Sequence, residues 1–369
     1  MFGKKGGFTF GRGKIGSGPW NPGNHDRTKE VTNNGKASNH DFRPMDTGYI
    51  SPSDIKRALA QTLNGENRWN LNYNLLDMTG RSTYKAIERA VRNGLPKLTV
   101  ANVGKDVNYY MEVLDSLIRD DPSLFFVNTA IRVVQSGARC EIRFDYNRFL
   151  NQRTILQEQL ISVGKKIITE TIKGHNLPYE VELAIHDYLI KNTVYDRSDP
   201  EAAHSLIGPL LYGKGCCEGI SEAFCFLANS SGLSTSMISG ILDGESHRWN
   251  IVEIDGKRYH LDVTSDLSGI HGYFNCSDQM IKRSHHFNAD VRCNYEDLHY
   301  HVVNRSRFQD EKRALEFIGK RASQGIDDME VMIDSAPEPN NFIRYITRSL
   351  NRSAGITCTD NIYYRIKLK

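Results

Sequence analysis

Two β-type runs separated by Asp255-Gly256 constrain the fold of this chain more than any other feature of its sequence. The runs are SHRWNIVEI (246–254) and KRYHLDV (257–263). An Asp-Gly pair between such runs is a strong signal for a β-hairpin with a two-residue turn. The turn fixes the register, because the last residue of the first run then pairs with the first residue of the second.

This register brings polar side chains together on one face of the hairpin. Trp249 is expected to face Asp262, and His247 lies one diagonal step away. Diagonal neighbours on a sheet face lie about 7–8 Å apart, with closer Cβ atoms. We therefore expect the Asp262 carboxylate to reach one imidazole nitrogen of His247 and leave the other nitrogen for a nucleophile.

A candidate nucleophile lies in the segment GKGCCEGISEAFCFLANSSG (213–232). From Cys217 onwards, Ile220, Phe224 and Leu227 recur at helical spacing, so the pattern predicts a helix that begins at Cys217. The free N–H groups and the positive dipole end of a helix start favour thiolate over thiol. The same N–H groups can stabilise an oxyanion.

The pieces GCCEGISEAF, SHRWN and YHLDVTSD, in this order, resemble the transglutaminase-like superfamily. The likeness extends over about 175–290 and implies a papain-like α+β core with thiol acyl-transfer chemistry. By resemblance, the nucleophile is Cys217, the base is His247 and the acid is Asp262. His260 corresponds to a histidine of the family pattern that has no catalytic role, and Cys216 takes a position that is usually apolar.

Other residues near this pattern have simpler interpretations. We expect Cys216 to be a small buried hydrophobe and His260 a packing or hydrogen-bonding residue. Tyr212 and His204 are candidates, by proximity alone, for the second oxyanion donor. A zinc site is disfavoured because short Cys-x(2–4)-Cys pairs are missing, so we expect no metal and no cofactor; the potential ligands considered were Cys276, His285, His286, Cys293, His299 and His301.

We divide the chain into four regions: a flexible, Gly-rich basic tail (1–50), a mixed helix-and-hairpin region (51–165), a transglutaminase-like catalytic domain (166–305) and a small C-terminal α/β element (306–369). The tail holds 10 of the 30 glycines and few aliphatic residues. It therefore cannot bury enough apolar surface to offset the conformational entropy that folding would cost. The predicted elements are helices from Ser51-Pro52, over 82–92, 110–118, 152–173 and 178–192, strands in LFFVN, AIRVV and ARCEIRFDY, and C-terminal strands over 329–333 and 363–368.

Composition narrows the location and the partners. The net charge is only +3, from 47 Lys and Arg against 44 Asp and Glu, which does not favour nucleic acid as an obligatory partner. No apolar run is long enough for a membrane span, and the N-terminus lacks the apolar core of an export signal. We therefore expect a cytoplasmic protein whose seven cysteines form no disulfide framework.

The expected reaction is acyl transfer at an amide bond of a protein or peptide substrate, through a thioester. Hydrolysis, as in a cysteine protease or amidase, is slightly favoured over protein-glutamine crosslinking, because a transferase must also keep water from the thioester. The alternative is a catalytically inactive interaction module whose basic tail binds an acidic partner.

Overall fold

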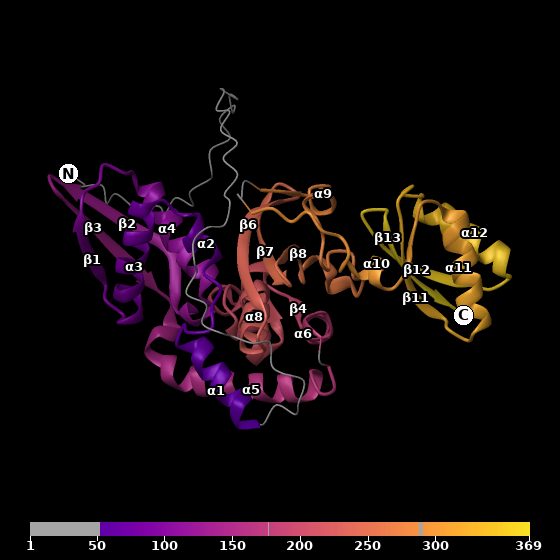
Figure 1. Ribbon diagram of the computed structural model, residues 1–369, viewed down its shortest axis with the longest axis horizontal. Coiled ribbons are helices and arrows are strands. Elements are labelled where there is room, and N and C mark those ends of the chain that lie inside the picture. The colour runs from indigo at the N-terminus through magenta and orange to yellow at the C-terminus, as the bar shows by residue number, and fades with distance from the viewer. Residues whose placement is uncertain (1–51, 176, 288–290) are drawn as a thin grey trace, which may run out of the picture. The chain divides into compact units, whose positions relative to one another are not determined.

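The computed structural model describes residues 52–175, 177–287 and 291–369 (Figure 1). Helices alternate with largely antiparallel sheets, which confirms the predicted α+β class. The basic tail predicted at 1–50 and the capping serine at 51 lie outside the described residues. Among the helices that are described, none is long and apolar enough to cross a membrane.

The first described region combines helices with a three-stranded antiparallel sheet of order β1-β3-β2. Its elements are α1 (Pro52–Leu63), α2 (Leu71–Leu75), α3 (Met78–Arg92), β1 (Lys97–Ala101), α4 (Val107–Asp120), η1 (Pro122–Leu124), β2 (Val127–Ser136) and β3 (Arg139–Tyr146). The helix predicted over 82–92 is α3, which begins at Met78 because the Asp77 side chain accepts the Gly80 N–H and caps the helix there. The run LFFVN is only partly a strand, since Leu124 still belongs to the turn η1.

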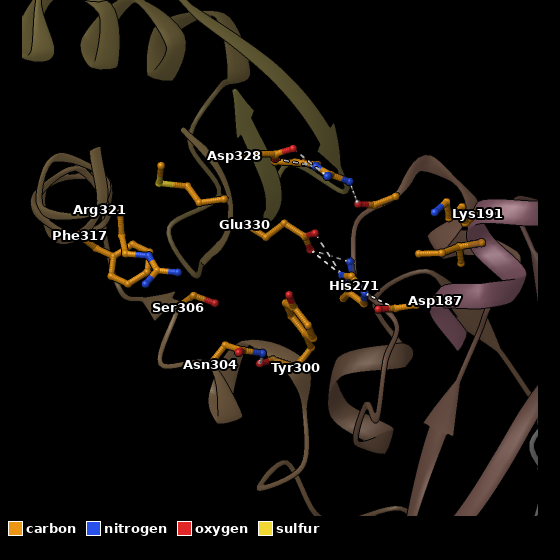
Figure 2. Close-up of a pocket in the computed structure, with 14 residues that line it drawn as sticks. Asp187, Lys191, His271, Tyr300, Asn304, Ser306, Phe317, Arg321, Asp328 and Glu330 are labelled. Atoms are coloured by element: carbon orange, nitrogen blue, oxygen red, sulfur yellow. Dashed lines mark hydrogen bonds and ion pairs between the residues drawn. The ribbon is translucent and has the colours of Figure 1, made fainter. Parts of the chain in front are cut away.

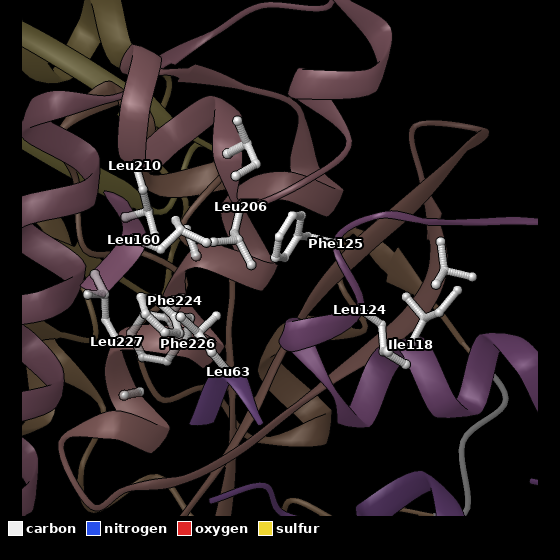
Figure 3. Close-up of a cluster of buried hydrophobic side chains, with 14 of the residues drawn as sticks. Leu63, Ile118, Leu124, Phe125, Leu160, Leu206, Leu210, Phe224, Phe226 and Leu227 are labelled. Atoms are coloured by element: carbon white, nitrogen blue, oxygen red, sulfur yellow. The ribbon is translucent and has the colours of Figure 1, made fainter. Parts of the chain in front are cut away.

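Three long helices form the centre of the next region: α5 (Arg153–Thr171), α6 (Pro178–Asn192) and α8 (Cys217–Ser230). All three agree closely with the predicted ranges. Nearly every residue of α8 is buried, and its Phe224 packs with Leu160 of α5 and Leu206 in one large apolar cluster (Figure 3). Because α8 lies within this cluster, its first residue, Cys217, is held on a rigid element.

The predicted hairpin consists of β7 (Glu245–Ile254) and β8 (Lys257–Leu261). Ile254 pairs with Lys257, which confirms the predicted register. Asp255 and Gly256 both have positive φ, 51° and 75°, as a type I′ turn requires. The sheet has the order β8-β7-β6-β9 and is completed by β6 (Ser234–Leu242) and β9 (His285–His286).

The last part of the chain forms a four-stranded sheet of order β10-β11-β13-β12 with its own apolar cluster. Its elements are β10 (Arg307–Phe308), α11 (Glu311–Ser323), β11 (Asp328–Ile333), α12 (Pro339–Leu350), β12 (Ala354–Thr359) and β13 (Tyr363–Leu368). The strands predicted over 329–333 and 363–368 are confirmed as β11 and β13, whereas β12 was not predicted.

Short elements connect these parts: η2 (Arg148–Gln152), β4 (Val194–Tyr195), α7 (Pro200–Ala203), η3 (Gly208–Tyr212), β5 (Lys214–Gly215), η4 (Ser265–Ser268), α9 (Asp278–Ile281) and α10 (Tyr300–Val303). The parallel pair β4-β5 brings Tyr195 opposite Gly215, two residues before Cys217.

Candidate active site

Cys217 is the first residue of α8, and its side chain is largely buried, at 8% exposure. The preceding residue, Cys216, has an extended backbone and is fully buried. Its N–H and its thiol both donate to the Ala203 carbonyl oxygen, at 3.0 and 3.2 Å. Cys216 therefore anchors the start of the helix, in agreement with its interpretation as a small buried residue.

Gly219 allows a loop to lie against the first turn of α8. A Cβ atom at this position would lie 2.4 Å from the Ala203 carbonyl oxygen and 2.5 Å from that of Ser205. Those distances are far inside van der Waals contact, so any side chain would push the loop away. The Cys-x-Gly spacing of Cys217-Glu218-Gly219 thus has a steric reason as well as a family resemblance.

Two hydrogen bonds fix α8 against β7, the strand that carries His247. The Ser221 hydroxyl donates to the Arg248 carbonyl oxygen at 3.0 Å, and the Asn250 side-chain amide donates to the Ser221 carbonyl oxygen at 3.0 Å. Both groups are buried, so breaking these bonds would leave polar atoms without partners. The helix start and the histidine strand are therefore held in a fixed relation.

His247 and Asp262 form a buried hydrogen-bonded pair. His247 Nε2 lies 2.8 Å from Asp262 Oδ2, as the hairpin register predicts, so Nδ1 is the ring nitrogen left for a sulfur. The Asp262 carboxylate also accepts the Ser265 hydroxyl at 2.5 Å and the Thr264 N–H at 3.0 Å. Although burial opposes ionisation, the charge of His247 and its hydrogen bond keep the pKa of Asp262 well below its usual range.

Cys217 and His247 stabilise each other's charged forms. A hydrogen bond from the Cys216 thiol, followed by one from His247, outweighs burial and lowers the pKa of Cys217 to about 4. The Cys216 thiol, which also lies 3.2 Å from the Ala203 carbonyl oxygen, and the His247 imidazole thus both stabilise the thiolate. Burial opposes a charge on His247 as well, but Asp262 and Cys217 raise its pKa to about 10. The favoured state at neutral pH is thiolate beside imidazolium.

The structure adds His285, which the sequence analysis did not assign to this site. His285 Nε2 lies 3.0 Å from the same Asp262 oxygen that contacts His247, and its Nδ1 lies 2.9 Å from the Ser284 hydroxyl. The strand β9 brings it there by pairing with the far end of β6. Its only sequence signal was the His285-His286 pair, which was weighed as a zinc ligand.

Trp249 and His260 form a second layer behind this pair. The Trp249 ring is fully buried and stacks on His247, with 5.8 Å between ring centroids and 20° between planes. Its Nε1–H donates to His260 Nδ1 at 3.1 Å, and His260 Nε2 contacts Asp278 Oδ1 at 2.9 Å. Both nitrogens of His260 are therefore engaged, in agreement with a packing and hydrogen-bonding role.

Around Cys217, the two predicted candidates for an oxyanion donor differ in position. His204 Nδ1 lies 2.8 Å from the Glu218 carboxylate, whereas Tyr212 is 54% exposed. The sequence analysis did not consider Tyr195. Burial raises the pKa of its phenol, and the nearby charge of Cys217 raises it further. The donor assignment stays a prediction.

The six Cys and His residues considered as zinc ligands do not gather at one place. His285 lies with His247 and Asp262, whereas Cys293 lies with His260 and Asp278. Within the described ranges, a third group of donor atoms close enough for a metal is His186, Asp187 and His271.

Comparison with known proteins finds one family model that matches part of the chain. The family model of the transglutaminase-like superfamily matches residues 165–263, a segment that contains Cys217, His247 and Asp262. No curated protein matches the chain.

Three solved structures are similar at 13% identity: a candidate cysteine protease from Cytophaga hutchinsonii (TM-score 0.26), a candidate protease from Parabacteroides distasonis (0.24) and a TGase (0.25). The alignments cover 37%, 37% and 46% of this chain and 61%, 35% and 50% of those structures. The chain thus spans less than two thirds of the length of each. The family match thus confirms the predicted resemblance to the transglutaminase-like superfamily over residues 165–263.

Proposed function

We propose that this protein is a thiol acyl-transfer enzyme that acts on amide bonds of a protein or peptide, with Cys217 as nucleophile, His247 as acid and base, and Asp262 as the residue that orients His247. One observation carries the proposal. A largely buried cysteine is the first residue of α8 and lies next to an imidazole that Asp262 holds at 2.8 Å, an arrangement that lowers the pKa of the thiol. Such a thiolate is a nucleophile at neutral pH.

In the first half of the reaction, the Cys217 thiolate attacks the amide carbonyl carbon and a C–S bond forms. The carbonyl π electrons move to the oxygen, and the N–H groups of the first turn of α8 can donate to that oxyanion. When the tetrahedral intermediate collapses, the C–N bond breaks and His247 gives its proton to the leaving nitrogen. The products are a thioester on Cys217 and a free amine or ammonia.

In the second half, His247 takes a proton from water or from a second amine, which attacks the thioester carbonyl and releases the Cys217 thiolate. Asp262 keeps its charge throughout and stabilises the imidazolium. We favour water as acceptor slightly, since hydrolysis demands only that water enters, whereas transfer demands a bound amine as well.

The test is an incubation of the full chain with a casein-like acceptor and a tagged primary amine. Peptide cleavage or ammonia release without incorporation indicates hydrolysis, and incorporation of the tag indicates transfer. Cys217→Ala should abolish either activity while the circular dichroism spectrum is retained. Cys358→Ala, a change at a half-buried thiol in β12, is the matched control and should keep full activity.

Two results would contradict the proposal. One is equal turnover by the wild type and Cys217→Ala. The other is a complete lack of turnover with every amide and amine tried, together with a Cys217 whose alkylation rate rises as steeply from pH 5 to pH 8 as that of other thiols. The second result would favour the inactive interaction module, whose association with an acidic partner should then weaken steeply with salt.

A further inference from the structure

A second cluster of buried histidines and carboxylates lies outside the catalytic residues. His186 and Asp187 are on α6, and His271 follows the turn η4. His186 is fully buried and His271 is 7% exposed. Asp187 and His271 line a pocket of about 780 Å³ that also includes residues of β11 (Figure 2). The cluster therefore places two buried imidazoles and the half-exposed Asp187 carboxylate beside a solvent-accessible space.

Each ring nitrogen of both histidines faces a carboxylate oxygen. His186 Nδ1 and His271 Nε2 lie 3.3 and 2.8 Å from the same oxygen, Asp187 Oδ1. On the far side of each ring, His186 Nε2 lies 3.1 Å from Asp266 Oδ2, and His271 Nδ1 lies 3.0 Å from Glu330 Oε2. Four nitrogens thus face three carboxylates.

The outer carboxylates are fixed in position. Asp266 Oδ1 accepts the backbone N–H groups of Gly272 and Tyr273, both at 3.0 Å. Glu330 Oε2 accepts the backbone N–H of His271 at 2.9 Å. These carboxylates are therefore well placed to take the one N–H that a neutral imidazole carries.

That assignment leaves both imidazole lone pairs facing Asp187 Oδ1. Lone pairs opposite a carboxylate oxygen repel it unless a cation lies between them. The repulsion is removed either by one additional proton on each imidazole or by one divalent cation that both imidazoles and Asp187 bind. Histidines that donate their outer N–H to a carboxylate and offer the inner nitrogen to a metal are the usual arrangement in zinc sites.

The donor spacing suits a small divalent metal. Metal–ligand bonds of about 2.0–2.1 Å in a tetrahedral site separate neighbouring donor atoms by about 3.3 Å. The His186 and Asp187 donor atoms are 3.3 Å apart, and the three inner donor atoms all lie within 4.8 Å of one another. Small movements of His271 would bring its Nε2 to about 3.3 Å from each of the other two donor atoms.

In the other two clusters of donor atoms among the described residues, no imidazole lone pair has to face a carboxylate oxygen. His260 Nδ1 accepts the Trp249 N–H, so its Nε2 carries the proton and donates to Asp278 without a cation. At the catalytic residues, His247 and His285 can each donate to Asp262, and the Ser284 hydroxyl can donate to the remaining nitrogen of His285.

We propose that His186 Nδ1, Asp187 Oδ1 and His271 Nε2 bind a divalent transition metal, with zinc as the natural probe, and that Asp266 and Glu330 orient the two imidazoles. Asp187 and His271 line the pocket, so its solvent supplies a water as the fourth ligand. Because Glu330 belongs to β11, its contacts with His271 also connect the C-terminal sheet to the metal ligands. This inference does not depend on the proposed enzymatic activity.

The test uses the full chain, stripped with a chelator and then titrated with ZnCl₂ by calorimetry, with metal content measured by mass spectrometry. We expect one equivalent of zinc, and Co²⁺ in its place should give the visible absorption of a tetrahedral site. Asp187→Asn and His271→Ala should each reduce affinity at least 100-fold. Glu330→Gln, which keeps all three ligands, should reduce it about 10–100-fold.

Controls distinguish this site from the other clusters. Cys293→Ser changes a donor atom of the His260 cluster and should bind zinc as the wild type does. If His271→Ala fails to fold, Asp187→Asn decides, because Asp187 is half exposed and its replacement is conservative. A folded wild type that takes up no stoichiometric zinc overturns the proposal, as does zinc binding that Asp187→Asn leaves unchanged. A wild type without zinc would mean that both imidazoles carry a proton toward Asp187 instead of binding a metal.

Discussion

The pH dependence of Cys217 alkylation is the sharpest consequence of the site. With a pKa of about 4, Cys217 is about 90% thiolate at pH 5 and fully thiolate at pH 8, so its rate with iodoacetamide should change by less than about twofold. An ordinary thiol with a pKa of about 8.5 goes from about 0.03% to about 24% thiolate over the same range, an increase of about 800-fold.

The slope with pH, rather than the rate at one pH, is the informative quantity. Nucleophilicity falls with thiol pKa, and a Brønsted coefficient of about 0.4–0.5 over about 4.5 units makes the Cys217 thiolate about 100-fold less reactive than an ordinary one. By this reasoning, Cys217 should react about 30-fold faster than an equally accessible ordinary thiol at pH 5. At pH 8 it should react more slowly.

The measurement is brief alkylation from pH 5 to pH 8 followed by mass spectrometric mapping. Cys358, whose thiol pKa is raised by burial, provides an internal reference with a steep profile in the same sample. His247→Ala should convert the flat Cys217 profile into a steep one, whereas His286→Ala, at an exposed position in β9, should leave it flat. A steep Cys217 profile in the wild type, or a flat one in His247→Ala, would refute the ion pair.

Three further predictions concern Gly219, Asp262 and Glu182. Gly219→Ala should lower the free energy of unfolding by about 1–3 kcal/mol, because its methyl group would overlap the Ala203 carbonyl; an unchanged guanidinium melt would contradict this. Asp262→Asn should lower the His247 pKa from about 10, since the negative charge is lost, and NMR titration of the ring would detect it. Burial raises the pKa of Glu182 to about 8, so folding takes up a proton and stability falls between about pH 4.3 and pH 8, by up to about 1.4 kcal/mol per unit. Glu182→Gln should abolish this slope, and the difference in melting temperature between variant and wild type should grow from pH 5 to pH 8.

The sequence predicted those parts of the site that depend on local signals. Asp255-Gly256 defined a turn, and alternation along the flanking strands then gave the side of the sheet on which His247 and Asp262 lie. The start of α8 at Cys217 followed from apolar spacing in the same way. Both inferences used contacts between residues close in sequence.

The remaining parts depend on contacts that have no local signature. The strand β9 has only two residues, too few for a periodic pattern, so His285 could not be assigned to Asp262, 23 residues earlier. The start of α3 was misplaced because Asp77, a polar residue in a polar stretch, acts as its cap. The strand β12 was missed because its polar threonines weaken the apolar alternation.

The tight turn at Asp255-Gly256 has a consequence for insertions and deletions in this hairpin. A single added residue that shifted the pairing of β8 by one position would point Asp262 to the opposite side of the sheet from His247. An even number of additions would preserve the facing, and a longer loop that left the pairing untouched would be neutral. Homologous chains of differing length at this bend are therefore expected to keep the strand pairing that places these two residues on one side, with any added residue taken up by the loop.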